Sequence, residues 1–365
     1  MEKRTDLRAA TAGVLVLAGA LGCGGPVGMT PGDGGLLGDA SPGRGVVVVP
    51  VESRETIADP RQPVFYLAAT STSPTNPKSV VALSTTTGAV VWATPLPFEP
   101  GHIAVSDDGS TLFVNAWAPE TQVARLNLST HAIEHMFSLP NSPYSGRPFQ
   151  PQDITTIPGS PHAAIVSMVD MVDFNSALAV FDDANMRPNQ LVSLGQARII
   201  IHMGGPGTLY GLSANGAFMA ATVDAQGLGP PMVGVPPGDL GHYARYFSYD
   251  GELIFSNNGI VLDPRTGTRV GTYDGDPAAV AVDRPAGRSY LAMPPPMGEA
   301  TGPLVVIECD RLALTRLRML TLEQVGGAYR MVRAIDGTLA LDALVITTNQ
   351  LVLIQPSAWS NATPP

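Results

Sequence analysis

The chain has 365 residues, a formal net charge of −10 and only 14% charged residues, so its bulk charge does not favour binding to a nucleic acid. It contains 39 Gly and 34 Pro, yet 44% of its residues are hydrophobic. A turn-rich chain with enough apolar residues for a core favours many short strands over long helices, and its length alone does not count its domains.

The first 22 residues have the layout of a secretory signal peptide. Three basic residues lie within positions 1–8, and the uncharged apolar stretch 9–22 that follows is too short to span a bilayer as a helix. Residues 20–23 (Ala-Leu-Gly-Cys) resemble the lipobox of bacterial lipoproteins, although Leu is commoner at its first position. The resemblance implies that Cys23 is lipidated and anchors the mature protein to a membrane of the cell envelope. The alternative is an ordinary signal peptide cut near Gly22, with a coincidental cysteine.

Residues 23–44 are rich in Gly and Pro and contain almost nothing that could form a core. We expect a flexible tether here, which would hold the body of the protein clear of the membrane. The predicted folded domain spans residues 45–357, and residues 358–365 are expected to be a disordered tail. The second cysteine, Cys309, lies in an apolar strand-like run, which predicts a buried and unreactive thiol.

Beyond the tether one pattern repeats: a short apolar strand, a turn with Asp or Gly, a second apolar strand, a polar loop and two more strands. The clearest copy is residues 103–115 (IAVSDDGSTLFVN), where Gly109 can take the positive φ that the turn needs. First hairpins of the pattern fall at residues 57–67, 103–115, 153–166, 198–210, 247–255, 280–292 and 334–341. Their spacing of a few tens of residues is typical of propeller blades. We therefore predict an all-β fold, a β-propeller of seven four-stranded blades, with six or eight as the alternatives.

The two ends of the domain predict how the ring closes. Residues 344–356 repeat the pattern of residues 253–264, and only nine residues follow them, so the last blade lacks an outer strand. The four valines at 46–49 can supply that strand, which would leave no unpaired edge between the first and last blades. The alternative is that these valines form the first blade's own inner strand and that the ring closes differently.

Two of the repeats resemble known propeller families. Residues 106–115 (SDDGSTLFVN) resemble the repeat of YVTN-type propellers, found in bacterial surface-layer and exported proteins. Residues 82–92 (ALSTTTGAVVW) resemble the quinoprotein repeat, in which the Trp, here Trp92, docks between blades; residues 261–267 repeat its turn, but Gly271 stands where Trp would fall. These resemblances imply a fold and no activity. With three Trp and no vicinal cysteine pair, the chain is not expected to bind a quinone, and we expect no cofactor.

Propellers usually bind ligands at one mouth of the central channel, where the inner strands begin. The candidates for such a site lie near the starts of inner strands in different blades: His102, Asp153, Arg198, His242 and Arg330. Imidazole, carboxylate and guanidinium groups could together bind a metal ion, a carboxylate or a lactone. The alternative is structural, because a Gly-His pair before an inner strand, as at His102 and His242, often serves hydrogen bonding within a blade. We assign no catalytic residue and no metal.

The remaining loops give weaker signals. Asp170 and Asp173 could supply two ligands to Ca²⁺, but that ion takes six to eight, so we interpret their loop as solvated. No nucleophile elbow, zinc spacing, P-loop or dinucleotide-binding glycine pattern occurs in the sequence. Our leading hypothesis is a non-enzymatic binding or scaffold module for a protein or a cell-envelope polymer. The alternatives are an exported lactonase-like or other hydrolase, with His102, His242 and Asp153 at the channel mouth, and a subunit of a larger envelope assembly.

Overall fold

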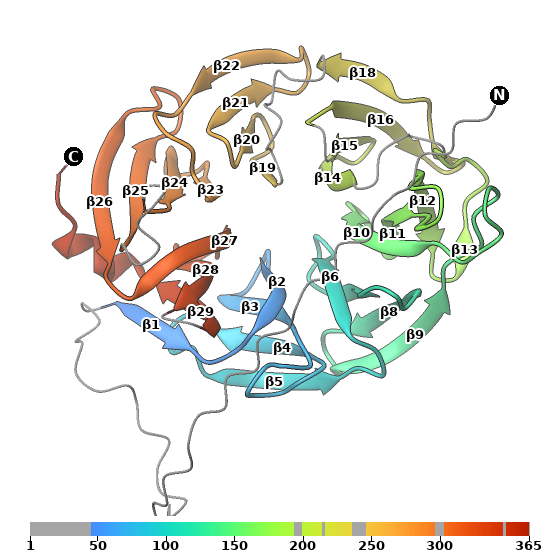
Figure 1. The fold of residues 1–365 in the computed structure, drawn as a ribbon, viewed down its shortest axis with the longest axis horizontal. Coiled ribbons are helices and arrows are strands. Elements are labelled where there is room, and N and C mark those ends of the chain that lie inside the picture. Colours follow the sequence, from blue (N-terminus) through green and yellow to red (C-terminus); the bar gives the residue numbers. More distant parts are fainter. Residues whose placement is uncertain are drawn as a thin grey trace, which may run out of the picture. The chain divides into compact units, whose positions relative to one another are not determined.

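The structure, a computed structural model, describes residues 45–192, 199–213, 216–235, 246–295, 303–345 and 348–364, all within one compact unit. Seven antiparallel sheets stand in a ring around a central channel (Figure 1). The fold is therefore the predicted all-β propeller with seven four-stranded blades. In the described part of the chain, no helix is long and apolar enough to cross a membrane. Cys23 and the predicted signal peptide and tether lie outside the described residues.

Each blade runs from an inner strand at the channel to an outer strand at the rim. Blades one and two consist of β2 (Ser53–Ala58), β3 (Val64–Ala69), β4 (Ser79–Ser84) and β5 (Val90–Pro95), then β6 (Pro100–Val105), β7 (Thr111–Ala116), β8 (Gln122–Asn127) and β9 (Ala132–Ser138). Blades three and four consist of β10 (Gln150–Ile157), β11 (Ser160–Val169), β12 (Ser176–Asp182) and β13 (Asn185–Met186), then β14 (Ile199–Gly205), β15 (Thr208–Ser213) and β16 (Phe218–Asp224), with β17 (Gly227–Leu228) and β18 (Met232–Val235) both paired to β16.

The last three blades follow the same order. Blades five and six consist of β19 (Phe247–Tyr249), β20 (Ile254–Ser256), β21 (Ile260–Asp263) and β22 (Thr268–Thr272), then β23 (Ala279–Asp283), β24 (Arg288–Met293), β25 (Leu304–Asp310) and β26 (Arg316–Leu322). Blade seven consists of β27 (Val325–Arg333), β28 (Leu339–Val345), β29 (Thr348–Ile354) and, as its outer strand, β1 (Val46–Val49).

The N-terminal strand closes the ring as predicted. β1 pairs with β29 in antiparallel register, from Val46 opposite Ile354 to Val49 opposite Leu351. Val47 and Val49 pack into the apolar cluster shared by blades seven and one. The alternative, in which the valines form the first blade's own inner strand, is wrong because β2 takes that position.

The C-terminal segment folds back onto blade six. A 3₁₀ helix, η1 (Pro356–Asn361), buries Trp359 against Tyr290, with ring centroids 5.5 Å apart, and Thr363 exchanges backbone hydrogen bonds with Met319 of β26. The expectation of a disordered tail over residues 358–365 is therefore wrong for residues 358–364. The N-terminal strand occupies the outer position of blade seven, so the C-terminal residues are left to cover the neighbouring blade.

Neighbouring blades are joined by side chains from the outer turns. Trp92 of blade one stacks on His131 of blade two, with ring centroids 4.6 Å apart, so it docks between blades as the quinoprotein-like repeat implies. At the corresponding position of blade five, a Cβ on Gly271 would lie 2.5 Å from Leu314 of blade six. The turn residues His131 and Leu314 both take a positive φ, near 57°. Where the Trp is missing, the next blade's turn thus fills its place.

Candidate functional site

Four charged or polar side chains occupy equivalent places in four successive inner strands. Arg330, Glu55, His102 and Asp153 lie on β27, β2, β6 and β10, which belong to blades seven, one, two and three. We call this set the mouth ring. The side chains of Glu55, His102 and Asp153 are buried, with 6–7% of each residue exposed.

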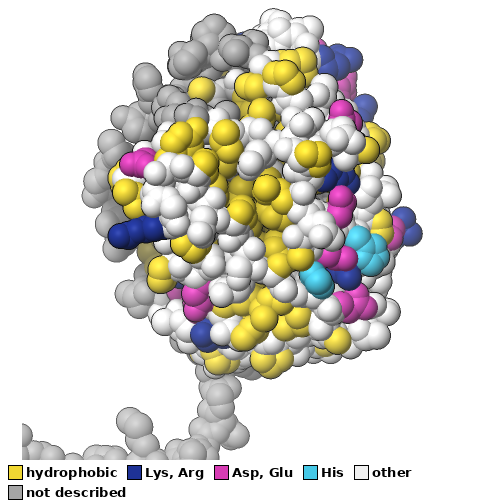
Figure 2. Space-filling model, turned by 90° about the vertical axis from the view of Figure 1, so that its right-hand side faces the viewer, with side chains coloured by type: hydrophobic (Ala, Val, Ile, Leu, Met, Phe, Trp, Pro, Cys, Tyr) yellow, Lys and Arg dark blue, Asp and Glu magenta, His cyan; other side chains and the backbone are white. Residues whose placement is uncertain are grey.

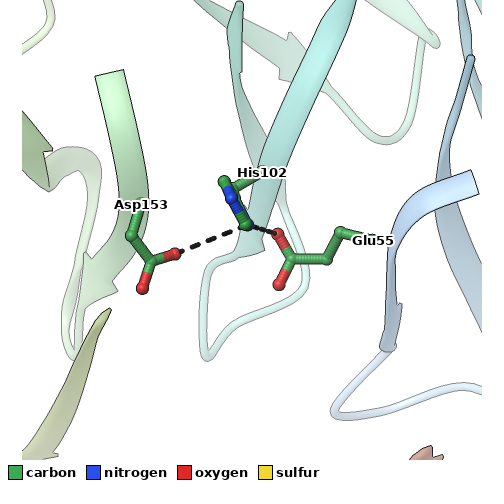
Figure 3. A group of neighbouring side chains, drawn as sticks. All are labelled: Glu55, His102 and Asp153. Atoms are coloured by element: carbon green, nitrogen blue, oxygen red, sulfur yellow. Dashed lines mark hydrogen bonds and ion pairs between the residues drawn. The ribbon is translucent and has the colours of Figure 1, made fainter. Parts of the chain in front are cut away.

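Each carboxylate of the mouth ring binds the blade that follows its own. Oε2 of Glu55 is 2.9 Å from Nδ1 of His102 (Figure 3) and also accepts the backbone N–H of Ile103 at 2.8 Å. Asp153 repeats the arrangement two blades further on, where its Oδ2 accepts the N–H of Ile201 at 2.8 Å. Its other oxygen lies 3.8 Å from Nδ1 of His102. Backbone and side chain together thus link blades one to four.

Blade seven joins the same network from the other side. The Arg330 guanidinium forms an ion pair with Oε1 of Glu55 and lies 5.0 Å above the ring of Tyr246. Beside it, Asp342 on β28 accepts hydrogen bonds from the hydroxyls of Ser53 and Thr56, both at 2.7 Å. These bonds hold the last blade to the first at the channel, as β1 does at the rim.

Burial sets the charge states of the mouth ring. Burial alone would raise the pKa of Glu55, but the charges of Arg330 and His102 outweigh it and hold the pKa at about 2. For Asp153 and Asp342 burial prevails, and the pKa of each carboxyl lies above its ordinary value. Burial would lower the pKa of Arg330, but the negative charge of Glu55 keeps it raised. Glu55 and Arg330 are therefore a firmly ionised pair.

The mouth ring opens into the central channel, a cavity of about 410 Å³. Glu55, Asp153 and Arg330 line it together with mostly apolar residues from all seven inner strands. His202 of β14 also faces the channel, where its side chain is exposed; the protein that surrounds it in the channel lowers its pKa by desolvation. The channel thus has a charged mouth and an apolar wall.

The loops at this same end of the ring carry a second feature. Gln150, the first residue of β10, pairs with Val169, so loop 170–175 lies at the end of the blade where the inner strand begins. We call this end of the propeller, where the inner strands begin, the loop face. Asp170 is buried, and it accepts the backbone N–H of Val172 at 2.9 Å. Our interpretation of the loop as solvated is therefore wrong for Asp170, although Asp173 is exposed.

Asp170 lies between two loops. Burial would raise the pKa of Asp170, but the hydroxyls of Ser142 and Ser145 and the amides of Val172 and Asp173 outweigh it and hold the pKa at about 2. The hydroxyls come from the loop between blades two and three, so Asp170 interacts electrostatically with both loops. Its well-formed hydrogen bond is the one from Val172 in its own loop, and its Oδ2 has no hydrogen-bond partner among the described residues.

These two loops hold apolar side chains out in solvent. Tyr144, Met171, Val172 and Phe174 are each 49–55% exposed, and we call them the loop-face patch. Phe174 also has a φ of 54°, a left-handed conformation that bulky residues rarely adopt. In the neighbouring loop of blade two, Trp117 is 40% exposed and lies 3.9 Å beneath the Arg54 guanidinium.

The outer side of the propeller over blades two to four exposes many hydrophobic side chains. Figure 2 shows hydrophobic side chains gathered across the middle of this side, charged side chains toward both margins and His side chains toward one. Exposed apolar residues of the outer strands in blades two to four include Met136 on β9, Met186 on β13 and Met232 on β18.

Comparisons with known proteins agree on the fold. No protein-family model matches the sequence, and no curated protein matches it. The solved structure titled "Structure of U3-55K" is 11% identical, with a TM-score of 0.59 over 85% of this chain and 98% of that one. "Crystal structure of RRP9 WD40 repeats" is 12% identical, with a TM-score of 0.62 over 85% of this chain and 97% of that one. The chain shares the seven-bladed β-propeller fold of these structures. Likeness at this identity carries the fold alone.

The propeller brings together three of the five residues predicted for the channel mouth. His102, Asp153 and Arg330 converge there, whereas Arg198 and His242 lie outside the described residues. A Cβ on Gly101 would lie 2.4 Å from Oδ1 of Asn115, which accepts the backbone N–H of His102. The backbone of the Gly101-His102 pair thus has a structural role, which leaves the imidazole of His102 at the channel mouth; the pair at His242 lies outside the described residues.

Sequence reasoning missed Glu55 and Asp342. Glu55 stands four residues before Asp59, as His102 stands four before Ser106 at the next hairpin, so alignment of the repeats could have found it. Asp342 lies in the middle of an apolar second strand, and no local signal distinguishes it. Cys309 is buried as predicted, and burial raises the pKa of its thiol to about 11.

Proposed function

We propose that this propeller is an exported, lipid-anchored binding module that holds a protein partner on its loop face. The loop-face patch carries the proposal. Exposed aromatic, Met and Val side chains on a rigid base are typical of protein interfaces, in which a few large residues provide most of the binding energy. The buried Asp170 accepts the N–H of Val172 and orders loop 170–175 beforehand, so less conformational freedom is lost when a partner binds.

The charge of the whole chain indicates the chemistry of the partner. The two loops of the patch carry one exposed charge of each sign, Asp173 and Arg147, and the whole chain has a net charge of −10. From this net charge we propose a partner surface that presents apolar side chains beside Lys or Arg. A cell-envelope polymer is the alternative ligand for the same face.

Site-specific photo-crosslinking in the producing cells tests this function. A photoreactive residue at Val172 lies in the patch, and one at Val270, which is 48% exposed on the rim strand β22, is the matched control. We expect one discrete protein adduct from position 172 and none at the same mass from position 270. Equal patterns from both positions would contradict the proposal.

The anchor is proposed from the lipobox-like residues 20–23 and the tether that follows them. Labelled palmitate should enter the full chain, and Cys23→Ser should abolish the label and release the protein from the membrane fraction. Unchanged labelling of the Cys23→Ser variant would remove this part of the proposal.

An exported hydrolase of the lactonase type is the second candidate. The observation that favours it is the convergence of Glu55, His102 and Asp153 at the mouth of a channel. Loss of a measured hydrolytic activity in His102→Gln, with folding intact, would support this candidate over the first.

A further inference from the structure

The mouth ring contains three side chains of the types that hold a transition-metal ion. Glu55, His102 and Asp153 each offer one donor atom, and the three atoms lie within 4.8 Å of one another. Three consecutive blades supply them, so the set forms where these blades pack side by side at the channel. Figure 3 shows the two carboxylates pointing at the imidazole from opposite sides.

The mouth holds more acidic than basic side chains. Glu55, Asp153 and Asp342 are three carboxyl groups, and among the described side chains of the network Arg330 is the one guanidinium, already paired with Glu55. A divalent cation would balance this excess of acidic groups.

The ligands are oriented by further hydrogen bonds, as in metal sites generally. Asp153 accepts the N–H groups of Ile154 and Ile201, and Glu55 accepts the N–H of Ile103. Arg330 contacts the other oxygen of Glu55, Oε1, and leaves Oε2 facing His102. A carboxylate held in this way keeps lone pairs for an ion.

We propose that Glu55, His102 and Asp153 bind one divalent transition-metal ion, of the Zn²⁺ type, that ties blades one, two and three together at the channel. One imidazole nitrogen and two carboxylate oxygens suit Zn²⁺. Because Glu55 and Asp153 line the cavity, the fourth coordination position is open to the channel. This site is independent of the loop-face patch, so either proposal can fail alone.

Metal titration of the purified full chain tests the site. Protein stripped with a chelator is titrated with Zn²⁺ by calorimetry and with Co²⁺ by visible absorption. We expect one ion per chain, a Co²⁺ spectrum of low coordination number, and a melting midpoint that rises with Zn²⁺ concentration. His102→Gln should weaken binding by about 100-fold or more and remove the Co²⁺ bands.

His162→Ala is the matched control, because the His162 side chain is 61% exposed and lies near the start of β11, at the end of the blade opposite the loop face. It should bind the metal as the wild type does. If His102→Gln fails to fold, Asp153→Asn must show the same loss of binding. The proposal is overturned if the wild type binds no ion in the micromolar range, or if a folded His102→Gln or Asp153→Asn variant binds as tightly as the wild type.

Discussion

The channel mouth and the loop-face patch lie at the same end of the propeller, but they place their side chains in opposite environments. At the mouth, charged side chains are kept from water, and each is bonded to the neighbouring blade: Glu55 to Ile103, and Asp153 to Ile201. At the patch, apolar side chains are exposed to water on two loops, and the buried carboxylate of Asp170 accepts the N–H of Val172 in one of them.

The difference indicates which region holds the ring and which region binds. Buried charges that satisfy one another across blades are tied to the integrity of the fold, since removing one leaves its partner unpaired. Exposed apolar groups on a fixed backbone contribute little to folding and are available to a partner. Mutations should therefore separate the two regions, with large losses of stability at the mouth and small ones at the patch.

Opening the ring should have the largest effect, because both regions need a closed propeller. Deletion of 46–49 removes the outer strand of blade seven and exposes the edge of β29, which should cost about 5 kcal/mol or more, comparable with the whole stability of many domains. Urea unfolding measures the loss. A deletion of residues 31–34 in the predicted tether is the control, and equal midpoints for the two deletions would refute the closure.

Breaking the mouth ring should come next. Glu55→Ala leaves Arg330, His102 and the Ile103 amide without their acceptor, so we expect a loss of about 3–5 kcal/mol in the free energy of unfolding, measured in the presence of a chelator. Glu323→Ala, at an exposed carboxylate, should change it by less than about 0.5 kcal/mol. A loss at Glu55 no larger than the control would show that the network does not hold the blades.

Removing the buried carboxylate of Asp170 should have a smaller effect. Asp170→Asn is expected to cost about 1–3 kcal/mol at neutral pH, because buried donors lose a charged acceptor. The pKa of Asp170 is about 2 in the folded protein, below roughly 4 in the unfolded chain, so its contribution is present above pH 4 and is lost as the pH falls toward 2.

The difference in urea midpoint between wild type and Asp170→Asn should therefore shrink as the pH is lowered toward about 3. Asp173→Asn, in the same loop but exposed, is the control and should leave the midpoint unchanged at either pH. A pH-independent cost at Asp170 would mean that its charge does not stabilise the folded protein.

Much of the fold could be predicted from the sequence because each blade contains a hairpin that can be recognised in a short stretch of sequence. Each of the seven predicted first hairpins corresponds to the inner two strands of a blade, including the weak copy at 198–210, and the valines at 46–49 close the ring. The end of the chain could not be predicted. The burial of Trp359 depends on which blade lies beside the C-terminal segment, and no local sequence pattern indicates which blade that is.

The site was harder to predict because its members are far apart in sequence. Aligned hairpins place His102, Asp153 and Arg330 at one mouth, but the ion pair of Arg330 with Glu55 joins residues 275 positions apart. The burial of Asp170 was missed for a similar reason, because its hydroxyl partners come from a different loop. Neither contact produces a periodic pattern in the sequence from which it could be predicted.

The most direct test of the account is the crosslinked adduct from position 172 in a Tyr144→Ser/Phe174→Ser variant, measured beside its melting midpoint. Both side chains are about half exposed, so the midpoint should match that of the wild type within the effect of about 0.5 kcal/mol typical of surface substitutions, while the adduct falls at least roughly tenfold. An undiminished adduct, or a variant that unfolds as readily as Glu55→Ala, would contradict the division between a region that holds the ring and a region that binds.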